Sequence, residues 1–141
     1  MTVALPWDCA VPGVPASLQG SSRKRADWRT RAASAALSRW PAGEPPLAVP
    51  LALTVALLHS GEPVDVDNRL KPTLDGLIGI AYDDDDRLDQ VLGLRRDLRE
   101  GWRAARVSAV LAGALVQATI EGRPFVYLRL TPPAELEDLL R

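Results

Sequence analysis

The chain has 141 residues, the size of one ordinary domain, with 47% hydrophobic residues, 25% charged residues and a formal net charge of -1. This composition excludes a disordered chain, and the near-zero net charge argues against a protein that coats nucleic acid by bulk charge. A single cysteine and a single histidine exclude an intramolecular disulfide framework and a Cys-based or multi-His metal site within one chain. The longest apolar stretches fall short of the ~18 residues of a membrane span, and no basic secretory signal opens the chain, so we expect a cytoplasmic protein.

Charge is strongly segregated along the chain. Residues 21–40 carry six basic residues against one acidic residue, residues 62–90 carry nine acidic against three basic, and residues 95–106 carry five basic against two acidic. Such blocks are ordinarily solvated faces. The alternative interpretation is an acidic metal cluster flanked by basic surfaces that bind a polyanion.

The first third of the chain predicts a strand, a helix and a second strand. Prolines and glycines in residues 2–20 indicate a short strand followed by an irregular loop. Residues 23–40 predict a helix, because apolar residues recur there at helical spacing. The stripe consists of Trp28, Ala32, Ala35, Ala36 and Trp40. Three prolines end this helix, and the continuously apolar residues 47–59 predict a buried strand.

The middle of the chain predicts a second helix, from about Asn68 to Ile80, with Pro72 in its first turn, where a missing N–H costs least. Its buried stripe would consist of Leu70, Leu74, Leu77 and Ile78. Asn68, Lys71 and Asp75 would share a different face, within roughly 60° of one another. In the rest of the chain, we expect strands over residues 87–96 and 125–130. The segment 101–117 between them fits either a helix or a strand. A short amphipathic helix is expected over residues 134–141.

Asp65 and Asp67 are the first chemical clue. On an extended segment, residues i and i+2 project to the same side, about 6.6 Å apart at Cα. Two carboxylates held in this way repel each other unless a cation neutralises them, and Mg²⁺ prefers carboxylate and water oxygens. The alternative interpretation of Asp-x-Asp-Asn is a turn followed by a helix N-cap.

The acidic run 83–86 is the second clue. A helix of about twelve residues advances the chain by about 18 Å, so a turn near Ala81 and Tyr82 must bring the run back beside the earlier couplet. The alternative is a solvated loop. An EF-hand calcium loop is excluded, because Leu88 stands at its sixth position and Leu94 at its twelfth.

Lys71 also has two interpretations. Near a helix start it is ordinarily an exposed residue, and the helix dipole disfavours it there. One turn from paired aspartates, it would contact a scissile phosphate and stabilise charge that develops in the transition state.

The segment from Asp65 to Val91, DVDNRLKPTLDGLIGIAYDDDDRLDQV, resembles the core of the RusA-type Holliday junction resolvases, endonucleases of bacteria and their phages. The matching positions are Asp65, Asp67, Asn68, Lys71, Asp75, Gly79 and Tyr82. The family's acidic pair falls on Asp84 and Asp85, and the run of four aspartates leaves Asp86 as a further candidate. The segment 13–17 and the basic helix after it also resemble the family.

The resemblance implies a Mg²⁺-dependent endodeoxyribonuclease that cleaves branched DNA such as a four-way junction and acts as a homodimer, with Mn²⁺ as a substitute ion. It implies metal binding by Asp65, Asp67 and Asp85 with help from Asp84, and charge stabilisation by Lys71. Asn68 and Asp75 would orient these groups. The expected DNA-phosphate contacts are Arg23, Lys24, Arg25 and Arg29. With the predicted elements, the resemblance implies a single α+β domain over residues 1–141, with a small mixed sheet packed against two main helices.

Three other functions stay open. The first is a branched-DNA-binding protein of the same family that does not cut. The second is a nucleotide-sugar transferase with an Asp-x-Asp metal site, which 141 residues leave little room for. The third is a calcium-stabilised interaction module. A nuclease would cut with Mg²⁺ and stall with Ca²⁺, which separates these possibilities.

Overall fold

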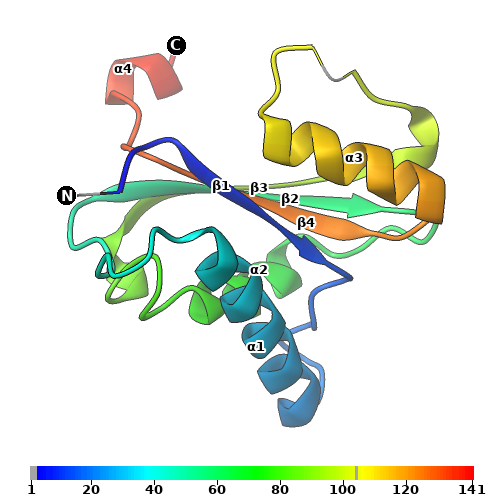
Figure 1. Cartoon of the computed structure of the whole chain (residues 1–141), viewed down its shortest axis with the longest axis horizontal. Helices are drawn as coiled ribbons and strands as arrows, with labels where there is room; N and C mark the ends of the chain where they lie inside the picture. Colours follow the sequence, from blue (N-terminus) through cyan, green and yellow to red (C-terminus); the bar gives the residue numbers. More distant parts are fainter. Residues whose placement is uncertain (1–2, 104) are drawn as a thin grey trace.

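A mixed four-stranded sheet forms the centre of the molecule (Figure 1). A computed structural model describes residues 3–103 and 105–141. The strands are β1 (Trp7–Pro12), β2 (Leu51–His59), β3 (Leu88–Asp97) and β4 (Phe125–Thr131), in the order β1-β4-β2-β3. β4 runs antiparallel to both β1 and β2, whereas β2 and β3 are parallel. The protein is therefore a single α+β domain, as the sequence predicted.

Helices cover both faces of this sheet. α1 (Ser22–Arg39) and α2 (Asp67–Gly76) lie on one face, and α3 (Ala109–Glu121) lies on the other (Figure 1). Alternate side chains of β2 pack against the helices on opposite faces of the sheet, since successive side chains of a strand point in opposite directions. Leu53 and Val55 pack in the core beneath α1 and α2, whereas Ala56 packs beneath α3. The short elements are η1 (Asp85–Arg87), η2 (Leu98–Glu100) and α4 (Leu136–Leu139).

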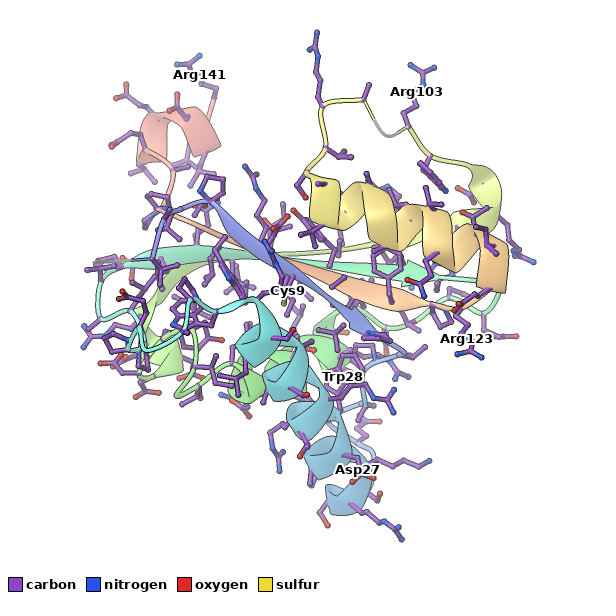
Figure 2. All side chains as sticks on the ribbon, in the orientation of Figure 1. Cys9, Asp27, Trp28, Arg103, Arg123 and Arg141 are labelled. Carbon is purple, nitrogen blue, oxygen red and sulfur yellow. The ribbon has the colours of Figure 1, made fainter. Side chains whose placement is uncertain are left out.

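Most predicted elements are confirmed. The predicted stripe of α1 is buried at Trp28, Ala32, Ala36 and Trp40. The segment 101–117, which fitted either a helix or a strand, is helical from Ala109 onward. The Ser108 side chain caps this helix, α3, by accepting a hydrogen bond from the Leu111 backbone N–H. Figure 2 shows Trp28 on α1, beside Asp27. No helix within the described ranges has the length and apolar character needed to cross a bilayer.

The prediction for the end of the second helix is wrong. α2 ends at Gly76, not near Ile80. The chain then turns tightly, with Gly79 at a φ of 87° that favours glycine, and the Gly79 N–H donates to the Tyr82 carbonyl at 2.7 Å. This local turn replaces the last helical turn that the apolar periodicity suggested.

Two glycines allow α2 to pack closely. A Cβ atom on Gly76 would lie 2.9 Å from the Ala32 Cβ and 3.1 Å from the Arg29 carbonyl oxygen on α1. A Cβ atom on Gly93 of β3 would lie 2.8 Å from Val66 Cγ1. All three distances are shorter than ordinary packing allows, so these glycines fix how near α2 stands to α1 and to the sheet.

Gly76→Ala is expected to lower the free energy of unfolding by about 1–3 kcal/mol, because the added methyl group must push α2 away from the α1 backbone. Gly113→Ala is the matched control, since nothing lies within 4 Å of a Cβ at this position inside α3. There the same change should stabilise the protein by roughly 0.5–1 kcal/mol. Urea unfolding of both variants measures the difference, and equal effects would contradict the close packing.

Candidate active site

The start of α2 is held by contacts from distant parts of the chain. The Arg95 guanidinium of β3 donates from Nη1 to the Val64 carbonyl at 2.7 Å, and the Leu18 N–H donates to the Asn68 carbonyl at 2.8 Å. Inside the helix, the buried Thr73 hydroxyl accepts from Trp28 Nε1 at 2.9 Å. These bonds tie the acidic segment to β3, to the N-terminal loop and to α1.

Asp65 and Asp67 do not lie on an extended segment, so that expectation is wrong. Val66 between them is helical, with φ -66° and ψ -52°, and Asp67 is the first residue of α2. The negative charge of Asp67 suits this position, because the helix dipole is positive at its N-terminus. Asn68 links the pair, donating from its backbone N–H to Asp67 Oδ1 and from Nδ2 to Asp65 Oδ2, each at 2.9 Å. This hydrogen bond holds the Asp65 carboxylate in a fixed direction.

The chain turns back after α2 near Ala81 and Tyr82, as predicted, whereas the meeting of the acidic run with Asp65 and Asp67 stays a prediction. Tyr82 is fully buried, and its hydroxyl donates to the Leu74 carbonyl of α2 at 2.6 Å. Leu47 pairs with the same segment: its N–H donates to the Ala81 carbonyl at 2.9 Å, and its carbonyl accepts from the Asp83 N–H at 3.3 Å. These bonds bring the acidic run back alongside α2.

Lys71 joins the two acidic segments. Its Nζ lies 2.8 Å from Asp75 Oδ1, one helical turn along α2, and also forms an ion pair with the Asp85 carboxylate of η1. Hydrogen bonds to Asp75 and then to Asp85 raise the pKa of Lys71, so its ammonium group stays charged at neutral pH. In turn, the hydrogen bond from Lys71 lowers the pKa of Asp85.

Lys71→Gln is expected to return the pKa of Asp85 toward its ordinary value of 3.8. In the native protein, the stabilisation due to the ionised carboxylate is present above pH ~4 and is lost as the pH falls through the lowered pKa of folded Asp85. The stabilisation of the folded state by the charged Lys71 side chain is present below pH ~10.4. It is lost as the pH rises through the raised pKa of Lys71 in the folded protein. Carboxyl titration by NMR in metal-free buffer measures the change, and an unchanged Asp85 pKa would contradict the ion pair.

The donor chemistry of the site suits a hard divalent cation, because its polar groups are carboxylates. However, no group of three or more His, Cys, Asp or Glu side chains stands ready to hold a metal ion anywhere in residues 3–103 and 105–141. Asp85 instead uses the Lys71 ammonium as its counter-ion. A cation bound by Asp85 would therefore compete with this lysine.

The other members of the acidic run have separate partners or face solvent. The Asp84 side chain caps η1, accepting from the Asp85 backbone N–H at 2.7 Å. Asp83 forms an ion pair with Arg87 at 2.8 Å, and Asp86 is exposed. The run therefore presents Asp85 to Lys71, which favours Asp85 over Asp86 as the residue that belongs to the site.

The four predicted DNA contacts on α1 differ in their surroundings. Arg23 and Lys24 are exposed at the start of the helix. Arg25 folds back onto the preceding loop, where Nη1 donates to the Leu18 carbonyl at 3.0 Å and also to the Gly20 carbonyl. Arg29 is half-buried beside Gly76. Arg23 and Lys24 are thus the most accessible of the four.

Sequence reasoning missed two residues that position the site. Gly93 lets Val66 and Leu70 approach β3, and Arg95 holds the carbonyl of Val64. An isolated glycine inside a predicted strand was the available signal for the first, because it often marks a close approach of another element. Arg95 gave no signal, since it stood in a basic block with no visible partner.

No family model matches the chain, and no curated protein matches it. The function of the site must therefore be inferred from the chemistry of its side chains.

Proposed function

We propose that the protein is a Mg²⁺-dependent endodeoxyribonuclease that cleaves branched DNA, with a site like that of the RusA-type resolvases. The observation that supports this proposal is the meeting of α2 and η1 at Lys71, which contacts both Asp75 and Asp85. A lysine held between carboxylates from two segments is a suitable arrangement for phosphoryl chemistry, since it supplies a fixed positive charge beside acidic groups.

Each side chain of the site would have its own function in the reaction. Asp65, Asp67 and Asp85 would hold the ion, and Asp84 would assist. When bound, Mg²⁺ supplies a Lewis acid for the scissile phosphate and lowers the pKa of water. Lys71 keeps its proton and places its ammonium where charge develops on the phosphate oxygens, while Asp75 fixes the direction of its side chain. Lastly, Asn68 orients Asp65 through its amide.

DNA would be held by the basic start of α1. Arg23 and Lys24 are exposed there and would contact phosphates without reading sequence, so binding would weaken steeply as salt rises. A homodimer would present two such sites, and its two-fold symmetry would match the symmetry of a four-way junction.

A branched-DNA-binding protein that does not cut is the second candidate. It is favoured by one observation, the pairing of Asp85 with Lys71 in a region where the described residues hold no assembled group of three metal-binding side chains. In this case Lys71 would permanently neutralise the acidic run and the chain would recognise DNA shape alone.

One experiment separates the two candidates. Purified protein is incubated with labelled four-way, flap and linear duplex DNA in Mg²⁺, in Ca²⁺ and in EDTA. We expect cleavage of the branched substrates in Mg²⁺, and stalling in Ca²⁺ with DNA still bound. Retention of branched DNA without a cut in Mg²⁺ or Mn²⁺ would establish the second candidate, and neither binding nor cutting would reject both.

A further inference from the structure

A pocket of about 670 Å³ is lined by the sheet and by α3. α3 covers the face of the sheet opposite α1 and α2 (Figure 1). This volume is typical of sites for small organic ligands. Its floor and inner wall are apolar and consist of Ala56, Leu58, Leu94, Leu111 and Leu115. Trp102 also lines it, and the Trp102 indole is fixed by a hydrogen bond from Nε1 to Thr119 Oγ1 at 3.0 Å. The pocket therefore offers an apolar floor with an aromatic ring at its wall.

Buried polar groups stand at one end of this pocket. The Asp8 carboxylate is 8% exposed, and its Oδ2 accepts from the Tyr127 hydroxyl at 2.7 Å and from the Ser108 hydroxyl. Arg39 reaches Oδ1 at 3.3 Å from α1. Burial and the neighbouring Asp8 raise the pKa of Tyr127 to about 12, which keeps its hydroxyl proton in place. These groups give the pocket fixed hydrogen-bonding positions above its apolar floor.

The pocket lining holds four arginines and three acidic residues, and two of the acidic residues already have partners outside the pocket: Asp8 pairs with Arg39 and Asp97 with Arg99. Asp8, Arg129 and Thr54 stand side by side on β1, β4 and β2, and all three line the pocket. Arg129 nevertheless forms no ion pair with any described residue, and neither does Arg96 on β3. Arg103 and Arg106 line the same pocket from the loop before α3. Unpaired guanidinium groups beside an apolar floor suit a ligand with an anionic head and an apolar body.

We propose that this pocket binds a nucleoside monophosphate, either free or as an unpaired nucleotide of a DNA strand. The phosphate would lie against Arg129, and the flat base would lie on the apolar floor beside Trp102. The sugar hydroxyl and base N–H groups would find acceptors in Asp8 and Thr54, and an alkyl phosphate has no such donors to offer. This site does not depend on the proposed nuclease chemistry, because Lys71 lies on the opposite face of the sheet.

Calorimetric titration of the full chain with dAMP, without added Mg²⁺, tests the proposal. We expect saturable binding that weakens about tenfold in Arg129→Gln, through loss of a charge-assisted hydrogen bond. Arg129 is exposed, so this variant should fold normally, which circular dichroism verifies. Arg123→Gln is the matched control, because Arg123 follows the end of α3 and does not line this pocket (Figure 2).

The probes separate the possible ligands. Deoxyadenosine should bind much more weakly than dAMP, and a 5′-phosphorylated tetranucleotide shows whether a strand end binds more tightly than the free nucleotide. Lys71→Ala should bind dAMP as the native chain does, even if the nuclease proposal fails. Absence of dAMP and tetranucleotide binding, equal losses in Arg129→Gln and Arg123→Gln, or equally tight binding of octyl phosphate would overturn the assignment.

Discussion

Asp67→Asn is expected to reduce DNA cleavage by at least roughly a hundredfold, while DNA binding stays the same or becomes tighter. The change removes a proposed metal ligand at the start of α2 and keeps the size of the side chain. It also removes one negative charge that repels the DNA phosphates. Single-turnover cleavage of a labelled four-way junction in Mg²⁺ measures the first effect, and a gel-shift assay in Ca²⁺ measures the second.

The matched control for this variant is Asp138→Asn on α4, another exposed aspartate, which lies outside the proposed site and should leave cleavage unchanged. If Asp67→Asn lost DNA binding and still cut at the native rate, Asp67 would not be a metal ligand. Its contribution would then be limited to the structure at the start of α2.

Lys71→Ala is expected to lower turnover by about 100- to 1,000-fold, with Mg²⁺ binding retained or tighter, because the ammonium group no longer competes for Asp85. The lysine contacts two carboxylates but donates no oxygen to a cation, so its loss should affect the chemical step more than the metal site. Lys71→Arg should restore part of the activity, because it keeps the charge while changing its position. Turnover at saturating DNA, together with Mg²⁺ titration by calorimetry, separates the two effects.

Arg141→Ala serves as the control for lost positive charge, since Arg141 lies at the C-terminus and pairs with Asp138. Loss of Mg²⁺ affinity in Lys71→Ala, accompanied by unfolding of the acidic run, would give Lys71 a structural function. Native turnover in Lys71→Ala would exclude it from the reaction altogether.

Much of the fold follows from local patterns in the sequence. The spacing of Trp28, Ala32 and Ala36 predicted the buried face of α1, and the apolar run 47–59 predicted a buried strand, which the structure has as β2. Segments with one dominant periodicity can be predicted in this way, because the buried face sets the pattern. The Ala-rich segment of α3 satisfied two periodicities, and only its packing on the second face of the sheet decides between them.

The candidate site was less predictable, because its geometry depends on contacts between distant residues. The sequence indicated that the chain reverses near Tyr82, but it did not predict the ion pair between Lys71 and Asp85. The helical state of Val66 did not follow, because it depends on how α2 packs over Gly93 and on the bond from Arg95 to Val64. Local propensity carries no information about such contacts.

The most direct test of the proposed metal centre is a Mn²⁺ titration followed by electron paramagnetic resonance, with the native chain, Asp67→Asn and Asp85→Asn. These two aspartates lie on α2 and η1, so a shared ion requires both. We predict saturable binding in the native chain and a loss of affinity of more than about tenfold in each variant. Native affinity in either variant would contradict a centre shared by the two segments.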